Sequence, residues 1–365
     1  MKSGLTLVQL AQEIERRANA KKDIVANTSK TTFAATGDEK NANFRLQAGG
    51  LDFGVNDIAH SQVATHTEIP KAYYDKMRSA APALLSDNVN CWFQKYPSPR
   101  MIRTLDGNAR AFLSDKYRPL ENEDLAEAVI PPLMELGLDV MSSQITDRKL
   151  YIKCVHPKVT RELKALGGKF GDGQHNIVRC LAPAITISNS EVGEGALSIL
   201  GGVYDRFCSN LASFGERSTR KYHVGGKHEL GGEDAYAMLS DQTRRITDAA
   251  LWAQVGDIVR GAFNEANFAA LCDKIAETAT HKIEGDVVKV VELASKRFRL
   301  NEAEGSSVLR QLIEGADLSR FGLYNAITRA SQDITDYDRA TELERMGAQV
   351  IELPAGEWKQ LAAAA

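Results

Sequence analysis

The middle of the chain decides the fold, and it reads Leu181-Ala-Pro-Ala-Ile-Thr-Ile-Ser-Asn-Ser-Glu-Val-Gly-Glu-Gly-Ala-Leu-Ser-Ile-Leu200. Its first eight residues are rich in apolar and β-branched side chains and predict a strand. Residues 189–195 predict a turn, because Asn and Gly tolerate the positive φ angles that tight connections need. The apolar run at 196–200 predicts a second strand. The stretch therefore predicts two strands of a sheet joined by a short polar turn.

The turn at 189–195 has a functional interpretation beside this structural one. Its glycines would let backbone N–H groups approach an anion such as phosphate. Glu191 and Glu194 would repel phosphate, and would instead suit a metal ion. No Gly-Lys-Ser or Gly-Lys-Thr follows the glycines, so the turn is not a Walker motif.

The elements before this stretch alternate between helices and strands. Residues 6–20 predict a helix that Thr6 caps. Residues 27–43 predict a linker or an exposed hairpin, and 44–53 a strand interrupted at Gly49-Gly50. Residues 58–79 predict two helical pieces broken at Pro70, and 84–93 another helix. A hairpin is predicted for 101–104 and 109–113, about the turn at 106–108.

The elements around and after this stretch predict the fold class. Asn122 is predicted to cap an amphipathic helix that ends at Gly137. Residues 138–143 and 150–155 predict paired strands, and helices are predicted over 235–299 and 306–346. We expect an α+β fold, an antiparallel sheet with packed helices, followed by a mainly helical C-terminal region. The predicted parts are an N-terminal helix at 1–30, an α+β core at 31–232 and the helical region at 233–365.

Composition limits the kinds of protein this chain can be. Its 365 residues are long enough for one or two large cores, and its apolar fraction of 43% is ordinary for a globular protein. A net charge of -3 means that any nucleic-acid surface must be a local patch. Five scattered cysteines suit a reducing compartment, and no apolar run has the ~20 residues that span a bilayer. We therefore expect a protein of the cytoplasm without a membrane partner.

Two groups of cations suggest contacts with nucleic acid. The first group surrounds the predicted hairpin near residue 107. Just before it come Trp92, Lys95 and Tyr96, which would help to line a groove for single-stranded nucleic acid. The members of the first group are Arg100, Arg103, Arg110, Lys116 and Arg118. The second lies in residues 217–228, where basic side chains surround Tyr222 and Gly225-Gly226. Its members are Arg217, Arg220, Lys221, His223, Lys227 and His228. Ordinary solvated strand faces and loops are the alternative for both groups.

Motifs for metal binding or nucleophilic catalysis are weak. No Cys-x-x-Cys or His-Glu-x-x-His occurs, and Ser190 has no Gly-x-Ser-x-Gly context. The acids Glu191, Glu194 and Asp205 are the residues that a metal-dependent enzyme would use. The spacing of the acidic residues along the chain does not indicate a nuclease site.

Four blocks of sequence carry a family resemblance. They are Ile69-Pro70-Lys71-Ala72-Tyr73-Tyr74, the stretch from Arg110 to Leu120 that reads Arg-Ala-Phe-Leu-Ser-Asp-Lys-Tyr-Arg-Pro-Leu, residues 189–199 and residues 203–210. In this order the chain resembles the phage- and plasmid-borne family known as domain of unknown function 932, over about residues 50–230. The resemblance implies a mobile-element setting near recombination or replication genes. The alternation of strands and helices is also similar to single-strand annealing proteins of the Red-beta and RecT kind, which is analogy at the level of fold.

These observations lead to one hypothesis and two alternatives. The hypothesis is a non-enzymatic single-stranded DNA-binding, annealing protein that supports recombination or replication of a phage or plasmid in a bacterial host. It needs no cofactor, forms a ring or filament of identical subunits, and works beside a recombination nuclease. Its DNA contacts would be Arg103, Arg110, Lys116, Tyr117, Arg118, Arg217, Arg220, Lys221, Tyr222 and Lys227. The alternatives are an enzyme that acts on nucleic acid with Mg²⁺ at Glu191, Glu194 and Asp205, and an adaptor that binds proteins through its helical region.

Overall fold

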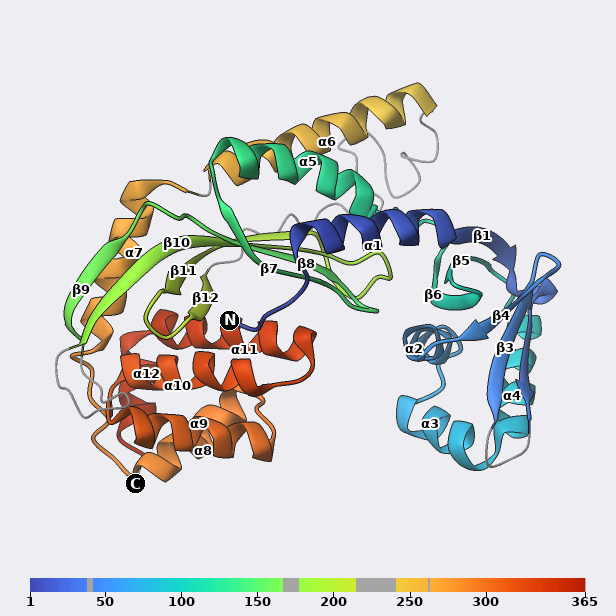
Figure 1. Ribbon diagram of the computed structural model, residues 1–365. Helices are drawn as coiled ribbons and strands as arrows, with labels where there is room; N and C mark the ends of the chain where they lie inside the picture. The colour runs from blue at the N-terminus through green and yellow to red at the C-terminus, as the bar shows by residue number, and fades with distance from the viewer. Residues whose placement is uncertain (38–41, 167–176, 215–240, 262, 365) are drawn as a thin grey trace.

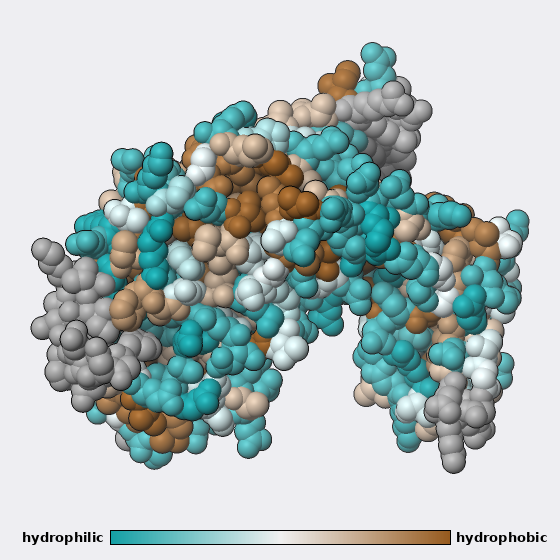
Figure 2. All heavy atoms as spheres, viewed as in Figure 1, coloured by the Kyte–Doolittle hydropathy of each residue, from teal (hydrophilic) through white to brown (hydrophobic). Residues whose placement is uncertain are grey.

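Two separate sheets organise the molecule. The computed structural model describes residues 1–37, 42–166, 177–214, 241–261 and 263–364. Figure 1 shows a smaller lobe, which holds the first six strands, beside a larger lobe that holds the other strands and most of the helices. Figure 2 shows a deep gap that separates much of the two lobes.

The smaller lobe has a six-stranded sheet with the order β1-β5-β6-β4-β3-β2. Its neighbouring strands are antiparallel, except that β4 and β6 run parallel. In chain order the strands are β1 (Lys22–Asn27), β2 (Thr32–Thr36), β3 (Asn43–Ala48), β4 (Leu51–Val55), β5 (Pro99–Leu105) and β6 (Asn108–Ser114).

Three helices share a core with this sheet. They are α2 (Asp57–His66), α3 (Lys71–Ala80) and α4 (Pro82–Lys95), and a short 3-10 turn, η1 (Thr28–Lys30), follows β1. The core is rich in aromatic side chains, with Phe33 stacked on Phe44 at 5.4 Å and Phe93 stacked on Phe112 at 5.6 Å. Stacked and edge-on rings add to the free energy of burial, so this core holds the lobe together.

The larger lobe has an antiparallel sheet with the order β12-β11-β10-β8-β7, and β9 pairs with β10 beside it. The strands are β7 (Asp139–Ile145), β8 (Leu150–Val155), β9 (Arg161–Leu166), β10 (Ile177–Asn189), β11 (Ser198–Asp205) and β12 (Asn210–Phe214). All six residues of β8 are buried. Strand β8 is therefore covered on both faces.

Helices lie on both sides of this second sheet (Figure 1). On one side are α1 (Leu7–Ala20), α5 (Asn122–Glu135) and α6 (Asp241–Gly261), which bury Ile152, Ile185 and Ile187. On the other side α10 and α11 lie against β12. The remaining helices in chain order are α7 (Glu265–Thr278), α8 (Val287–Phe298), α9 (Glu302–Gly315), α10 (Arg320–Asp333), α11 (Tyr337–Glu352) and α12 (Ala355–Ala362).

The expected α+β class is confirmed, with antiparallel-rich sheets followed by a helical C-terminal region. Several predicted elements appear as expected, including the helix capped by Thr6, the break at Pro70 and the hairpin about residue 107. Three strands, β1, β9 and β12, were not predicted. The predicted interrupted strand at 44–53 is a hairpin, because Gly49 and Gly50 both take positive φ and reverse the chain.

The boundaries of the lobes differ from the predicted parts. Residues 31–232 contain strands of two sheets, where one sheet was expected. Helix α1 packs with the larger lobe, and β1 directly after it pairs with β5 of the smaller lobe. The cause is that the chain crosses between the lobes twice, once after α1 and once before α5.

No helix among the described ranges combines the length and the apolar composition that a membrane span requires.

Candidate nucleic-acid interface

Arg103 and Arg110 lie inside the molecule, where the two lobes meet. Arg103 on β5 is 0% exposed, and its guanidinium bonds Asp23 at 2.9 Å, Glu121 at 2.5 Å and the Glu191 carbonyl at 2.8 Å. Arg110 on β6 is 6% exposed and pairs with Glu191 at 2.8 Å. A phosphate group cannot reach either side chain, so the prediction that they contact DNA is wrong.

Glu191 is the centre of this buried group of charges. One carboxylate oxygen accepts from Arg110, and the other accepts from the Asn122 backbone N–H at 2.9 Å. Burial alone would raise the pKa of Glu191, but Arg110, with its neighbours, lowers it to about 2. Burial raises the pKa of Glu121 nearby, because Arg103 compensates only part of the desolvation. The acids and cations around Glu191 therefore stabilise the contact between the lobes.

The rest of the turn at 189–195 docks on the smaller lobe. Val192 is buried against Ile58, Ala111 and Leu113, and its carbonyl accepts from Gln62 at 2.7 Å. Gly193 has a φ of 77°, and a Cβ on it would lie 2.8 Å from Leu113. The structural interpretation of this turn as a strand connection is thus supported, with the added role of joining two lobes.

Three more of the predicted DNA contacts, Lys116, Tyr117 and Arg118, lie on the connection between β6 and α5. Tyr117 donates to the Ser190 carbonyl at 3.2 Å, and its burial raises the pKa of its hydroxyl to about 12. Arg118 is 11% exposed and pairs with Asp248 of α6. Lys116 is exposed. Arg118 and Tyr117 are thus engaged within the protein, and the first cluster does not form the expected basic groove.

The second cluster lies outside the described residues. Arg217, Arg220, Lys221, Tyr222 and Lys227 all belong to the range 215–240, as do His223 and His228. Their predicted contacts with DNA remain predictions.

The three acids of the metal alternative do not share a site. Glu191 faces Arg110, whereas Asp205 ends β11 beside Leu181, far along β10 from Asn189. Asp205 is 1% exposed and pairs with Arg179 at 2.8 Å. Within the described ranges, no group of three or more His, Cys, Asp or Glu side chains is placed to hold a metal ion. The prediction of a joint metal site is therefore wrong.

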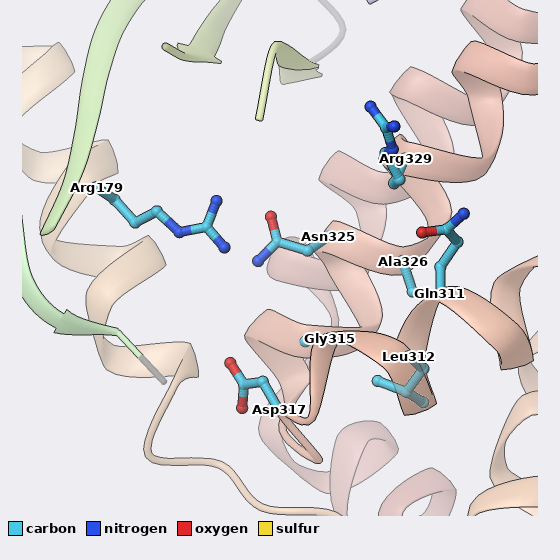
Figure 3. Close-up of a pocket in the computed structure, with 9 residues that line it drawn as sticks. Arg179, Gln311, Leu312, Gly315, Asp317, Asn325, Ala326 and Arg329 are labelled. Atoms are coloured by element: carbon cyan, nitrogen blue, oxygen red, sulfur yellow. The ribbon is translucent and has the colours of Figure 1, made fainter. Parts of the chain in front are cut away.

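Arg179 borders a small polar cavity of the larger lobe. Figure 3 shows its guanidinium pointing toward Asn325 and Asp317. The cavity is about 20 Å³, which is room for a single water molecule. The Oδ2 atom of Asp317 and the Oδ1 atom of Asn325 are buried without a hydrogen-bond partner among the described residues. A bound water would satisfy these acceptors, so this cavity fits a structural water.

An open groove with aromatic walls lies in the smaller lobe, between α4 and the connection from α2 to α3. Its volume is about 580 Å³, within the usual range for ligand sites. Its walls include Tyr73 at 48% exposure and Tyr96 at 63% exposure. Exposed rings that gather at one groove, rather than lying singly on the surface, mark a candidate binding site, so the groove is the main candidate site.

The spacing of Trp92 and Tyr96 on α4 builds one wall of the groove. Residues four apart share a helix face, and these rings stack at 5.8 Å with an angle of 7° between their planes. Lys95 lies 5.4 Å from the Trp92 ring and 5.7 Å from the Tyr96 ring. The indole N–H donates to Asn88 at 2.8 Å, which fixes the orientation of Trp92. The wall therefore consists of two parallel, stacked rings with one cation beside them.

The opposite side of the groove is formed where α2 ends. His66 lies among the rings of Phe93 and Phe112, at 5.9 and 5.5 Å. Burial, with a smaller effect of Arg100, lowers the pKa of His66 to about 4, so the ring is neutral at pH 7. Glu68 follows with a φ of 56°, a left-handed conformation that is strained for a residue with a side chain. The groove thus combines neutral rings with one acid at its rim.

The sequence contained part of this signal. Trp92, Lys95 and Tyr96 were expected to line a groove with the arginines around residue 107. The structure places the three residues together but buries Arg103 and Arg110 elsewhere. His66 and Tyr73 were missed, because they come from segments distant in sequence and only the fold brings them to α4.

Comparison of the chain with models of protein families, with curated proteins and with solved structures gives no match.

Proposed function

We propose that the protein binds single-stranded DNA, with bases stacked in the groove that Tyr73, Trp92 and Tyr96 line. The observation that carries the proposal is the pair of parallel rings beside Lys95, of which Tyr96 is 63% exposed and Trp92 is partly buried. Aromatic rings with a nearby cation are the common platform of proteins that bind single strands, since every base has a face that can stack. Annealing, recombination or replication of a mobile element, and assembly into a ring or filament, belong to the same proposal through the family resemblance.

The groove differs from the basic channel that the sequence suggested. Its cation is Lys95, whereas Lys71 nearby pairs with Asp75. Glu68 at the rim is suited to accept hydrogen bonds from amino groups of bases, and it disfavours phosphate. Stacking therefore contributes more of the binding free energy than charge does.

Fluorescence anisotropy with a labelled oligonucleotide of mixed sequence tests the proposal. We expect Tyr96→Ala to weaken binding roughly 5- to 150-fold, which corresponds to the ~1–3 kcal/mol of one stacked base. Phe207→Leu is the matched control, because Phe207 is an exposed ring of the larger lobe at 51% exposure. Equal affinity of wild type and Tyr96→Ala would place any binding outside the groove.

The salt dependence separates the groove from a basic channel. For single strands the slope of log K against log salt is about -0.7 per phosphate that a cation neutralises. One or two cations at the groove predict a slope of about -0.7 to -1.4, and a channel of six cations predicts about -4. A steep slope that Lys95→Gln leaves unchanged would contradict the proposal.

A further inference from the structure

A polar cavity lies in the larger lobe, between its sheet and α11. Its volume is about 180 Å³, and it is lined by the strands β8, β10, β11 and β12, by the turn after β10 and by α11. It is smaller than the ~300–1,000 Å³ of sites for drug-sized ligands. A small ligand, or one charged group of a larger ligand, fits this space.

Hydroxyl groups gather on this face of the sheet because alternate residues of a strand point the same way. Ser188 on β10 is opposite Ser198 on β11, and two residues earlier Thr186 bonds Ser213 of β12 at 2.9 Å. Thr341 of α11 also lines the cavity, but its hydroxyl donates to the Tyr337 carbonyl at 3.0 Å. The Ser188 and Ser198 hydroxyls form no hydrogen bond with another described residue, so they are able to donate to a ligand.

Two cations line the same cavity. Lys149 comes from the turn between β7 and β8, and Arg345 from α11. Gly195 makes room for Lys149, since a Cβ there would lie 2.9 Å from the lysine Cε and 3.1 Å from its Nζ. The φ of Gly195 is 148°, which other residues rarely adopt. The glycine of the turn thus lets the Lys149 ammonium group lie beside the cavity.

The acids of the turn point away from the cavity. Glu191 is engaged with Arg110, and Glu194 lines a different pocket beside Asp57 and Arg148. The remaining acid in the lining is Glu342, which pairs with Arg339 at 2.7 Å. The repulsion by Glu191 and Glu194 expected from the sequence does not apply on this side of the turn.

Asp338 and Glu344 also face this region from α11. Asp338 accepts hydrogen bonds from Tyr151 and Thr146, and Glu344 pairs with Lys153 at 2.7 Å. Glu342 and Glu344 are thus each paired with a cation, and Asp338 keeps its charge outside the lining. Lys149 and Arg345 bring two positive charges to the lining itself.

We infer that this cavity binds a phosphate group, that of inorganic phosphate or of a small phosphomonoester. Serine and threonine hydroxyls with a lysine and an arginine are the donors that phosphate oxygens accept from. The site lies in the other lobe from the aromatic groove and goes beyond the proposed function.

Isothermal titration calorimetry and thermal unfolding of the full chain with inorganic phosphate test the inference. We expect phosphate to raise the unfolding temperature more than chloride at equal ionic strength, because a ligand of the folded state stabilises it. Lys149→Gln should lower the phosphate affinity at least tenfold, and Lys158→Gln, an exposed lysine outside the cavity, should leave it unchanged. Equal effects of phosphate and chloride, or equal phosphate affinity of Lys149→Gln and wild type, would overturn the inference.

A second variant and a second ligand complete the test. Ser188→Ala with Ser198→Ala removes two donors with little loss of volume, so weaker phosphate binding in this double variant supports the site even where Lys149→Gln is unstable. A mononucleotide that binds as inorganic phosphate does, and competes with it, identifies a phosphomonoester as the wider ligand class. Oligonucleotide binding in the aromatic groove should be the same in Lys149→Gln and wild type, which separates failure of this inference from failure of the proposed function.

Discussion

At the scale of single residues, the charged side chains buried where the two lobes meet serve mainly the stability of the protein. Arg103 and Glu191 each form several hydrogen bonds within the protein, and Arg110 donates one to Glu191. A buried ion is tolerated only when its partners replace the water that it has lost. Removing one partner leaves the other charge uncompensated, so these residues affect stability far more than ligand binding.

We predict that Glu191→Gln lowers the free energy of unfolding by about 3–5 kcal/mol, since Arg110 would stay buried without its carboxylate. Glu194→Gln is the matched control in the same turn, because its side chain is partly exposed, and it should change stability by less than about 0.5 kcal/mol. Urea denaturation followed by tryptophan fluorescence measures both. Equal stability of the two variants would show that the buried group of charges does not hold the lobes.

We also predict that acid weakens the smaller lobe through His60. This ring is 1% exposed and hydrogen-bonded to Tyr74 at 2.8 Å, and burial lowers its pKa to about 3. Between pH 6.5 and about 3 the unfolded chain binds a proton that the folded ring does not. The free energy of unfolding should therefore fall by about 1.4 kcal/mol per pH unit for this histidine as pH drops.

His66 contributes to the same slope over the upper part of this range, because its pKa is lowered to about 4. His60→Phe should remove about one proton from the slope while keeping an aromatic ring beside Phe33 and Phe44. Urea denaturation at pH 7, 6 and 5 gives the slope. A slope that is the same in His60→Phe and wild type would contradict this account.

At the scale of elements, the sequence predicts local structure better than it predicts pairing. Thr6 and Gln9 form the capping box that begins α1, and Pro70 separates α2 from α3, because both signals act within a few residues. The strand β12 was missed since all five of its residues are buried and give no alternation. The hairpin of β3 and β4 depends on Gly49 and Gly50, where the strand pattern alone predicts only an interruption of one strand.

In the candidate site too, some features follow from the local sequence and others depend on how distant segments pack. The α4 wall, with Trp92 and Tyr96 four residues apart, follows from helical spacing. The burial of Arg103 and Arg110 does not follow from their own strands, because their partner Glu191 is 81 residues after Arg110. An alternating strand pattern indicates two faces, but only the docking of the second lobe decides which face is covered.

We predict that Gly193→Ala is more destabilising than Gly137→Ala. Both glycines have positive φ, at 77° and 61°, so each substitution incurs roughly 1–2 kcal/mol of left-handed strain. Only Gly193 faces a neighbour, with a Cβ position 2.8 Å from Leu113, whereas nothing lies within 4 Å of the Gly137 position. Thermal unfolding of the two variants isolates the contact between the turn and the smaller lobe. Equal losses would mean that backbone strain alone accounts for both.

At the scale of the whole molecule, the two lobes have separate cores and a narrow contact. The contact includes the buried charges around Glu191 and an apolar patch in which Val192 meets Ile58, Ala111 and Leu113. The aromatic groove lies in one lobe and the phosphate cavity in the other. The orientation of the lobes therefore sets the distance between the two proposed sites.

We predict that Val192→Asp separates the lobes without unfolding either core. Val192 is 1% exposed, and a carboxylate there would be buried without a cation of its own. Small-angle X-ray scattering should show a larger radius of gyration, while far-UV circular dichroism stays the same. Val288→Asp is the control, since Val288 is 46% exposed on α8. An unchanged radius for Val192→Asp would show that the apolar patch is dispensable.

The ion pair between Lys21 and Glu121, at 2.6 Å, has a consequence for how the gene could be rearranged. Lys21 directly precedes β1, the first strand of the smaller lobe, and Glu121 directly precedes α5 of the larger lobe, so the smaller lobe is an insertion whose two ends lie side by side. Insertions of this kind can be excised and replaced by a short linker. A chain in which residue 21 is joined directly to residue 121 should keep the second sheet with helices on both of its sides. The excised smaller lobe should fold on its own.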